Sequence, residues 1–296
     1  APTNREFLER RNRLLGPGNP LFYDEPVHLV RGEGVWLYDA DGQRYLDCYN
    51  NVPCVGHCHP HVVEALCEQA AKLNTHTRYL HENILDYAEH LLEKFDDSLS
   101  RVVLACTGSE ANDLALRIAT ANTGGSGFIC TNATYHGNTA AVAQLSSIFE
   151  PIGGYGEHIR MVSWPDSYRA LHDLSGEQLS DAYADQVRAA IDSFSDAGIP
   201  FGGMIVCPIF ANEGLPDIPE GYMQKAIGHV HNAGGLYIAD EVQAGFGRTG
   251  KWWGYEQSGV VPDIVTLGKP MGAGHPISGV VAKGKLIDEY RSREMY

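Results

Sequence analysis

Short apolar segments alternate with amphipathic helical segments from about residue 100 to the end of the chain. Helical patterns at 110–121, 181–194 and 220–232 separate several of the apolar segments. The expected strands are 101–106, 128–131, 159–163, 203–207, 236–239, 264–267 and 278–282. Such alternation is typical of a mostly parallel β-sheet that helices cover on both faces. The sequence therefore predicts an α/β fold, in which ligands bind beyond the carboxyl ends of the strands.

The first hundred residues have a different pattern. The expected β-type segments are 27–30, 35–38 and 43–46. Turn residues join them, including the hairpin dipeptide Asp41-Gly42, so we expect a small β meander. One helix is expected to begin at Pro60, and a second helical pattern covers residues 84–95.

The charge and composition of the chain exclude some classes of binding partner. With a formal net charge of −15 and no basic run, the chain lacks the focused Lys and Arg surface that nucleic acid or an acidic membrane requires. No stretch approaches the roughly 18 apolar residues of a membrane span, and residues 1–6 lack the apolar core of a signal peptide. The seven cysteines of this large chain are expected to be reduced thiols. We therefore expect a cytoplasmic protein without nucleic-acid or membrane partners.

Five potential zinc ligands lie close together, namely Cys54, His57, Cys58, His59 and His61. Structural zinc sites normally combine two ligand pairs that are separated in the sequence, and no second pair occurs here at a recognisable spacing. We therefore expect no metal, although these residue types alone leave a zinc site open.

A candidate phosphate site lies where residues 107–113 follow a strand and begin a helix. The start of a helix presents free backbone N–H groups and the positive end of the helix dipole, and Gly108 lets a phosphate approach the backbone. An ordinary capped helix explains the same pattern equally well.

Two charged residues follow expected strands. Asp240 would lie at the ligand-binding edge of the sheet, where a carboxylate needs a cationic partner such as a protonated ring nitrogen or Arg248. Lys269 follows another apolar strand in a loop rich in Gly and Pro. Partial burial would let it act as an imine-forming nucleophile and then as a base, whereas a solvated surface lysine is the alternative.

Tyr135 follows a further strand and would place an aromatic ring at the same edge, although core packing is the usual role of a tyrosine. Together with the other motifs it completes a set of four groups. These are a phosphate site, a stacking ring, a carboxylate for a pyridinium and an amine for an aldehyde, which are the groups that pyridoxal phosphate requires.

These motifs resemble the class III aminotransferases, a family of fold-type I pyridoxal phosphate enzymes. The matching stretches are 56–60, 108–112, 135–137, 239–243, 245–248 and 267–269, in the order of the family. The resemblance implies that residues 51–296 form the large cofactor-binding α/β domain and that residues 1–50 belong to a small α+β domain. It also implies that the C-terminal part of the small domain is absent from this sequence, and that the enzyme is a homodimer with shared active sites.

The resemblance also implies a cofactor site of Gly108 and Ser109 for the phosphate, together with Tyr135, His136, Asp240, Val242, Gln243 and Lys269. Tyr135 would stack on one ring face and Val242 on the other, and Gln243 would reach the phenolic oxygen. Asp240 would keep the ring nitrogen protonated, and Lys269 would hold the cofactor as a Schiff base.

Within the family, the chain resembles the ethanolamine-phosphate phospho-lyase branch through residues 45–48, 50–52, 55–60, 78–84, 108–117, 268–272 and 274–276. This implies elimination of phosphate from phosphoethanolamine, or from a similar phosphorylated amine, to give an aldehyde, ammonia and phosphate. Arg78 is our first candidate for binding the phosphate of the substrate and His81 the second, because both side chains can donate to an anion. An ordinary surface arginine is the alternative.

One departure from the family bears on the activity. Many class III transaminases carry two glutamates where this chain, by our alignment, has Cys207 and Asn212. That replacement weakens the alternative function of an ω-aminotransferase, unless Glu213 takes over one of the two positions. A binding protein without catalysis would be expected to have lost Lys269 or Asp240, and both are present.

Overall fold

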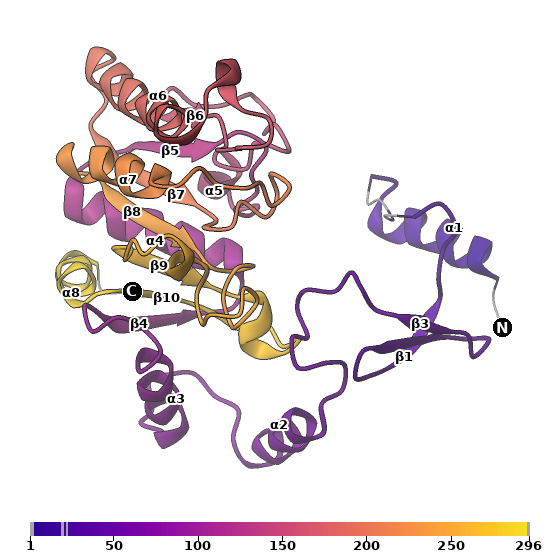
Figure 1. Cartoon of the computed structure of the whole chain (residues 1–296). Helices are drawn as coiled ribbons and strands as arrows, with labels where there is room; N and C mark the ends of the chain where they lie inside the picture. Colours follow the sequence, from indigo (N-terminus) through magenta and orange to yellow (C-terminus); the bar gives the residue numbers. More distant parts are fainter. Residues whose placement is uncertain (1–2, 19–20, 22, 295–296) are drawn as a thin grey trace. The chain divides into compact units, whose positions relative to one another are not determined.

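The structure is a computed structural model that describes residues 3–18, 21 and 23–294. The chain forms two compact units, Ala1–His76 and Thr77–Tyr296 (Figure 1). Residues 51–76 thus group with the N-terminal unit. The domain boundary that we expect from the family after residue 50 stays a prediction.

The N-terminal unit contains the expected β meander. Its elements are α1 (Asn4–Leu15), β1 (Leu29–Glu33), β2 (Trp36–Asp39), β3 (Arg44–Leu46) and α2 (Pro60–Lys72). The three strands pair antiparallel in the order β1-β2-β3. The carboxylate of Asp39 accepts hydrogen bonds from the backbone of Asp41 and Gln43, which shapes the turn before β3. Helix α1, which begins at a capping box of Thr3 and Glu6, was not among our predicted elements.

The second unit is built on a seven-stranded sheet. Its strands are β4 (Leu99–Ala105), β5 (Gly127–Thr131), β6 (Ile159–Val162), β7 (Phe201–Val206), β8 (Leu236–Asp240), β9 (Ile264–Leu267) and β10 (Ser278–Lys283). They lie in the order β4-β10-β9-β8-β7-β5-β6 (Figure 1). All pairs are parallel except those of β10, which runs antiparallel to both of its neighbours. The predicted strands and the mostly parallel α/β fold are confirmed.

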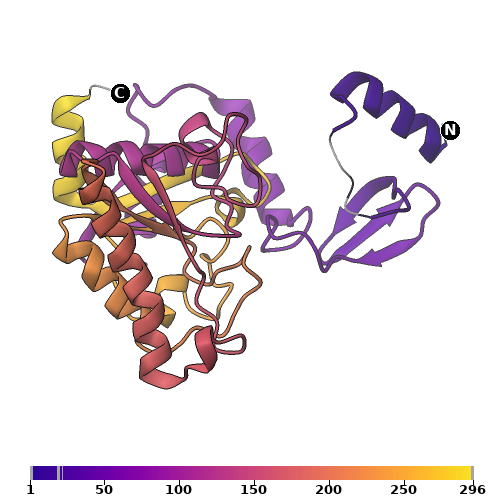
Figure 2. The same cartoon turned by 90° about the horizontal axis from the view of Figure 1, so that it is seen from above.

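Helices cover both faces of this sheet. They are α3 (Glu82–Leu92), α4 (Gly108–Thr123), α5 (Ala140–Ala143), α6 (Gly176–Asp196), α7 (Tyr222–Asn232) and α8 (Gly284–Arg293). One core lies under α6 and α7 and the other under α4 and α8, on opposite sides of the sheet in Figure 2. Successive side chains of β5 point to opposite faces of the sheet and so pack in different cores. Ile129 packs with α6 and α7, whereas Phe128 and Cys130 pack with α4.

A charge cluster around the buried Asp263 lies at the amino-terminal edge of the sheet. Asp263, directly before β9, accepts from Lys283 Nζ at 2.6 Å and from the backbone N–H of Tyr237 at 2.8 Å. His231 Nε2 lies 2.7 Å from the same carboxylate. Burial opposes the ionisation of Asp263, but these donors hold its pKa below the usual value. The cluster is therefore an ion-pair network of the scaffold, at the end of the strands opposite to the ligand-binding edge.

Gly203 marks a point where two central strands approach closely. A Cβ at this position of β7 would lie 2.3 Å from the carbonyl oxygen of Leu236 in β8. We expect Gly203→Ala to lower the free energy of unfolding by about 2–4 kcal/mol, because the paired backbone cannot move away. Gly228→Ala in α7 is the control, since its added Cβ would meet nothing within 4 Å and should stabilise the helix by about 0.5–1 kcal/mol. Equal urea-unfolding midpoints for the two variants would contradict this account.

Candidate functional site

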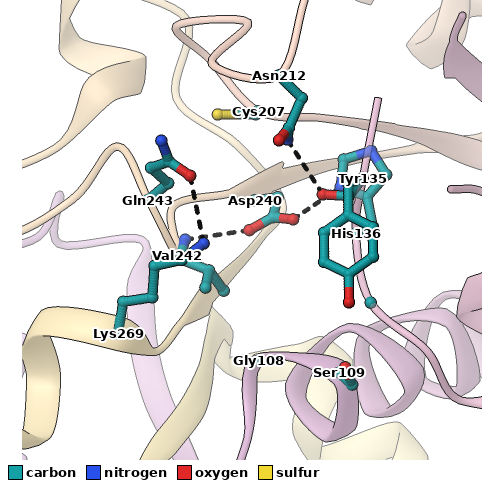
Figure 3. A pocket seen from close by; sticks show the side chains of 11 residues that line it. Gly108, Ser109, Tyr135, His136, Cys207, Asn212, Asp240, Val242, Gln243 and Lys269 are labelled. Carbon is teal, nitrogen blue, oxygen red and sulfur yellow. Dashed lines mark hydrogen bonds and ion pairs between the residues drawn. The ribbon is translucent and has the colours of Figure 1, made fainter. Parts of the chain in front are cut away.

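A pocket lies beyond the carboxyl ends of the central strands, where the fold predicts ligand binding (Figure 3). Its lining residues are Gly108, Ser109, Tyr135, His136, Gly137, Cys207, Asn212, Asp240, Val242, Gln243 and Lys269. The segments after β4, β5, β7, β8 and β9 all contribute. The eight residues predicted for the cofactor are therefore brought together here. Arg78 and His81 are not among the lining residues.

The start of α4 has the geometry of an anion site. Thr107 caps the helix, with its hydroxyl accepting from the backbone of Glu110 at 3.1 Å while the Glu110 carboxylate accepts from the backbone of Thr107 at 2.9 Å. The cap leaves the first N–H groups of the helix without intrahelical acceptors. A Cβ on Gly108 would lie 2.9 Å from Val242 Cγ1, so this close approach requires glycine. The capped helix and the phosphate site are thus compatible interpretations of one segment.

Ser109, the second residue of α4, faces the loop that follows β5. Its hydroxyl accepts a hydrogen bond from the backbone of Asn138 at 3.1 Å. A Cβ on Gly137 would lie 2.5 Å from the same hydroxyl oxygen, and Gly137 has a φ of +141°. Glycine is therefore required where this loop passes the start of α4, because a larger residue would displace the Ser109 side chain.

Asp240 is the last residue of β8 and is only 5% exposed. Its Oδ2 lies 2.7 Å from His136 Nδ1 and accepts from Asn112 Nδ2 at 3.0 Å. Its Oδ1 accepts from the backbone of Val242 at 3.0 Å and faces the hydroxyl of Thr266 at 3.5 Å. A buried carboxylate that faces a pocket needs a cationic partner, and a protonated ring nitrogen of pyridoxal phosphate fits that requirement.

Arg248, the alternative partner that the sequence offered for Asp240, donates from Nε to the backbone carbonyl of Gln243. It thus shapes the loop after β8. Asn112 and Thr266 were absent from our predicted site, although they hold the carboxylate of Asp240. The sequence pattern that could have identified Asn112 is a polar residue on the apolar face of α4, between Ala111 and Ala115.

Glu241, the second acid of the pair, has a structural role. It is fully buried, and its two carboxylate oxygens accept from the backbone N–H groups of Gly254 and Tyr255, both at 2.8 Å. Burial raises the pKa of Glu241 to about 7, although these two hydrogen bonds act against the rise. The carboxyl of Glu241 therefore ties the segment at Gly254 and Tyr255 to the end of β8, and Glu241 is not among the residues that line the pocket.

Lys269 lies two residues after the end of β9 and carries the amine of the site. Its Nζ donates to Gln243 Oε1 at 3.3 Å (Figure 3). Burial lowers the pKa of Lys269, an effect that the negative charge of Asp240 opposes and the positive charge of Arg248 reinforces. Its φ of +32° lies in the left-handed region, which costs a residue with a side chain about 1 kcal/mol or more. Strain of this kind is commonly retained at functional sites, and it places the amine at the pocket.

The two residues predicted to bind a substrate phosphate lie in the segment before and at the start of α3. His81 caps this helix, because its Nδ1 accepts from the backbone of Asn83 at 3.2 Å. The binding roles of Arg78 and His81 stay predictions. In the Cys and His cluster, His57 Nε2 lies 2.6 Å from Asp47. Across the part of the chain that the structure describes, no group of three or more His, Cys, Asp or Glu side chains is arranged to hold a metal ion.

Both positions at which we expect the chain to depart from many transaminases contribute to the pocket. Cys207 lies in the lining, and so does Asn212, whose Nδ2 donates to the backbone carbonyl of Tyr135 at 3.3 Å. Glu213 is not part of the lining, and its Oε1 accepts from the hydroxyl of Thr131 at 2.5 Å. Glu213 therefore does not replace an acid in the pocket.

The strand order and the pocket at the carboxyl edge define a class of protein, the fold-type I pyridoxal phosphate enzymes. Within this class, the chain belongs to the Aminotransferase class-III family, whose model matches residues 22–294. Pyridoxal phosphate is the cofactor of this family. The buried carboxylate of Asp240, the glycine-dependent helix start and the Lys269 amine all fit that group.

This chain is similar to proteins named as aminotransferases and also to one named as a phospho-lyase homolog. One is "Alanine--glyoxylate aminotransferase 2-like" of Drosophila melanogaster, 36% identical over 297 residues that cover 97% of this chain and 60% of the relative. Another is "Ethanolamine-phosphate phospho-lyase homolog 1" of Caenorhabditis elegans, 34% identical over 306 residues that cover 97% of this chain and 64% of the relative. The chain thus spans less than two thirds of the length of these relatives.

Among solved structures, the chain is similar to a phospholyase from Arthrobacter in complex with phosphoethanolamine. The two share 44% sequence identity with a TM-score of 0.94, over 98% of this chain and 69% of the other. In the part of this chain that the structure describes, no helix has the length and apolar character of a membrane span.

Proposed function

We propose that this chain belongs to a phospho-lyase that eliminates phosphate from phosphoethanolamine or a similar phosphorylated amine. The composition of the pocket carries the proposal, because Asp240 is the one carboxylate among the described residues that line it. By our alignment, Cys207 and Asn212 occupy the positions of the two glutamates of many transaminases. A pocket with this lining offers no second acid to repel a substrate phosphate or to pair with an arginine for α-carboxylates.

The likeness to solved and curated proteins supports the same proposal. The Arthrobacter phospholyase was solved with phosphoethanolamine bound, and its identity of 44% exceeds that of the other relatives named above. An ω-aminotransferase is the second candidate, favoured by the relative from Drosophila melanogaster, whose name is that of an aminotransferase.

The residues of the pocket have separate proposed roles. The start of α4 at Gly108 and Ser109 would bind the phosphate of the cofactor, and Tyr135 and Val242 would contact the two faces of its ring. Gln243 would donate to the phenolic oxygen. His136 supports the carboxylate of Asp240 at a distance of 2.7 Å. Together these side chains fix the orientation of the ring before the substrate arrives.

Bound pyridoxal phosphate supplies an aldehyde for the substrate amine and a ring that accepts electrons. Asp240 holds a proton at the ring nitrogen. Lys269, whose pKa is lowered by burial, takes the proton from the substrate carbon that carries the nitrogen. Where phosphate is attached to the neighbouring carbon, the electron pair of the broken carbon–hydrogen bond forms a double bond between the two carbons. The carbon–oxygen bond then breaks, and its electron pair leaves with the phosphate. Water then converts the released vinylamine into acetaldehyde and ammonia.

The two candidate functions differ in their need for a second substrate. We expect the full-length enzyme, loaded with pyridoxal phosphate, to release phosphate and acetaldehyde in equal amounts from phosphoethanolamine alone. Colorimetric phosphate detection and a coupled aldehyde assay measure the two products. Strict dependence on pyruvate or 2-oxoglutarate, with no phosphate release, would instead establish a transaminase.

The homodimer with shared active sites and the cytoplasmic location also belong to this proposal. Sedimentation of the full-length protein tests the first, and a twofold mass relative to one chain is the expected result. Cell fractionation tests the second.

A further inference from the structure

The side-chain amide of Asn112 lies among the buried groups of the cofactor site and has a partner for each of its polar atoms. Asn112 belongs to α4 and is 1% exposed. Its Nδ2 donates to the backbone carbonyl of His136 at 2.7 Å and to Asp240 Oδ2 at 3.0 Å. Its Oδ1 accepts from the hydroxyl of Thr266 at 2.6 Å. Both N–H bonds of the amide and its oxygen are therefore used.

These partners select one of the two orientations of the amide. In the flipped orientation, the oxygen of Asn112 would face two acceptors, the carbonyl of His136 and the carboxylate of Asp240. Neither has a proton to donate, and unsatisfied contacts of this kind are costly in a buried place. The hydroxyl of Thr266 adds to the preference, because it donates to the amide oxygen in the observed orientation. The NH₂ group of Asn112 is therefore directed at Asp240.

The hydroxyl of Thr266 has one proton and two acceptors within reach. Asn112 Oδ1 lies at 2.6 Å and Asp240 Oδ1 at 3.5 Å, so the proton is donated to Asn112. Oδ2 of Asp240 contacts His136 Nδ1 and Asn112 Nδ2. Oδ1 accepts a close hydrogen bond from the backbone of Val242. Because a carboxylate has about four acceptor positions, the described residues leave one position on Oδ1 available to a donor in the pocket.

We propose that Asn112 is a positioning residue for the ring nitrogen of pyridoxal phosphate and that Thr266 sets the orientation of its amide. The amide holds Oδ2 of Asp240 and also keeps the Thr266 proton away from Oδ1, so the carboxylate retains an acceptor position for the ring. Asn112 does not line the pocket, and it therefore acts on the cofactor through Asp240. It lies three residues after Ser109 on the same face of α4. One helix thus provides for the phosphate and for the ring nitrogen.

This role of Asn112 rests on the role proposed for Asp240, which a lyase and a transaminase both need. The test compares the dissociation constants, Kd, of two compounds for the full-length protein freed of cofactor. One is pyridoxal phosphate, and the other is its 1-deaza analogue, in which a C–H group replaces the ring nitrogen. Both compounds carry the same phosphate and aldehyde. Binding is followed by the absorbance of the cofactor, so the test needs no turnover.

We expect Asn112→Ala to raise the Kd of pyridoxal phosphate by about tenfold, because Asp240 loses an orienting donor and the Thr266 hydroxyl is free to turn to Oδ1. The Kd of the deaza analogue should stay unchanged, since its ring has no N–H to donate. An equal rise for both compounds would overturn the proposal, because Asn112 would then support only the fold. An unchanged Kd for both would overturn it too. Equal affinity of the wild type for both compounds would refute the role of Asp240 itself, and the role of Asn112 with it.

Asn122→Ala is the matched control. Asn122 also lies on α4, and its Nδ2 donates to two backbone carbonyls, those of Ile118 and Leu286. Its loss should lower the unfolding temperature and leave both dissociation constants unchanged. A selective rise for pyridoxal phosphate in this variant as well would contradict a specific role of Asn112.

Variants of Thr266 test the orientation of the amide and provide the test if Asn112→Ala fails to fold. Thr266→Ser keeps the hydroxyl and should bind both compounds as the wild type does. Thr266→Val leaves Asn112 Oδ1 without its donor and should weaken the binding of pyridoxal phosphate alone. In the Asn112→Ala background, Thr266→Val should instead lower the Kd of pyridoxal phosphate, because it removes the hydroxyl that competes for Asp240. Wild-type binding by the Thr266→Val single variant, or a further rise of the Kd in the double variant, would overturn the role of Thr266.

Discussion

Replacing Lys269 with alanine is expected to lower kcat for phosphate release by about 10³- to 10⁴-fold and to remove the absorbance band of lysine-bound pyridoxal phosphate. The reason is that, in the proposed mechanism, one amine performs two functions. It holds the cofactor between turnovers, and it takes the proton from the substrate carbon. Its lowered pKa and its place two residues after β9 suit both functions. Alanine has no nitrogen, and no other lysine lines the pocket among the described residues.

Lys285→Ala provides the matched control for this experiment, because Lys285 is an exposed residue near the start of α8. Both the spectrum and kcat of this variant should equal those of the wild type. A Lys269→Ala enzyme that kept the absorbance band and a tenth or more of the activity would show that another amine holds the cofactor. The loss of the side chain is also expected to leave the fold intact, as far-UV circular dichroism would show.

Replacing Asp240 with asparagine is expected to lower kcat by about 10²- to 10³-fold while the protein remains folded. The amide is neutral, so it no longer holds a proton at the ring nitrogen of the cofactor. Its NH₂ group would also face a donor, either His136 Nδ1 and Asn112 Nδ2 on one side or the backbone N–H of Val242 on the other. Steady-state kinetics with saturating pyridoxal phosphate measure the effect.

Asp263→Asn separates the cofactor role from the general cost of losing a buried carboxylate. Asp240 and Asp263 are equally exposed, at 5%, and both accept from a histidine and from a backbone N–H group. Asp263 lies at the opposite edge of the sheet with Lys283. We expect Asp263→Asn to lower the unfolding temperature but to leave kcat of the folded enzyme nearly unchanged. Equal losses of kcat in both variants would mean that Asp240 acts through stability alone.

The sequence predicted the sheet because the strands of a buried parallel sheet are continuous apolar segments between amphipathic helices. All seven predicted strands occur within about two residues of their expected limits, for example β9 at Ile264–Leu267. Helix α1 was missed since its residues are largely polar and none of them is buried. Tertiary packing does not select such a helix, and the capping box of Thr3 and Glu6 was its main local signal.

For the candidate site, the sequence by itself determined which chemical groups are present and at which strand ends they lie. Asp240 and Lys269 were recognisable there because a charged residue at the end of an apolar strand, or just beyond it, is placed at the ligand-binding edge. Only the tertiary structure decided which groups meet. Because the sheet brings together segments from distant parts of the chain, the side chains of Asn112 and His136 contact Asp240. Asn212 lines the pocket, whereas Glu213 bonds to Thr131 instead. The side chains of adjacent residues such as Asn212 and Glu213 point in different directions because the course of the loop backbone sets where each of them points. The local sequence does not fix that course.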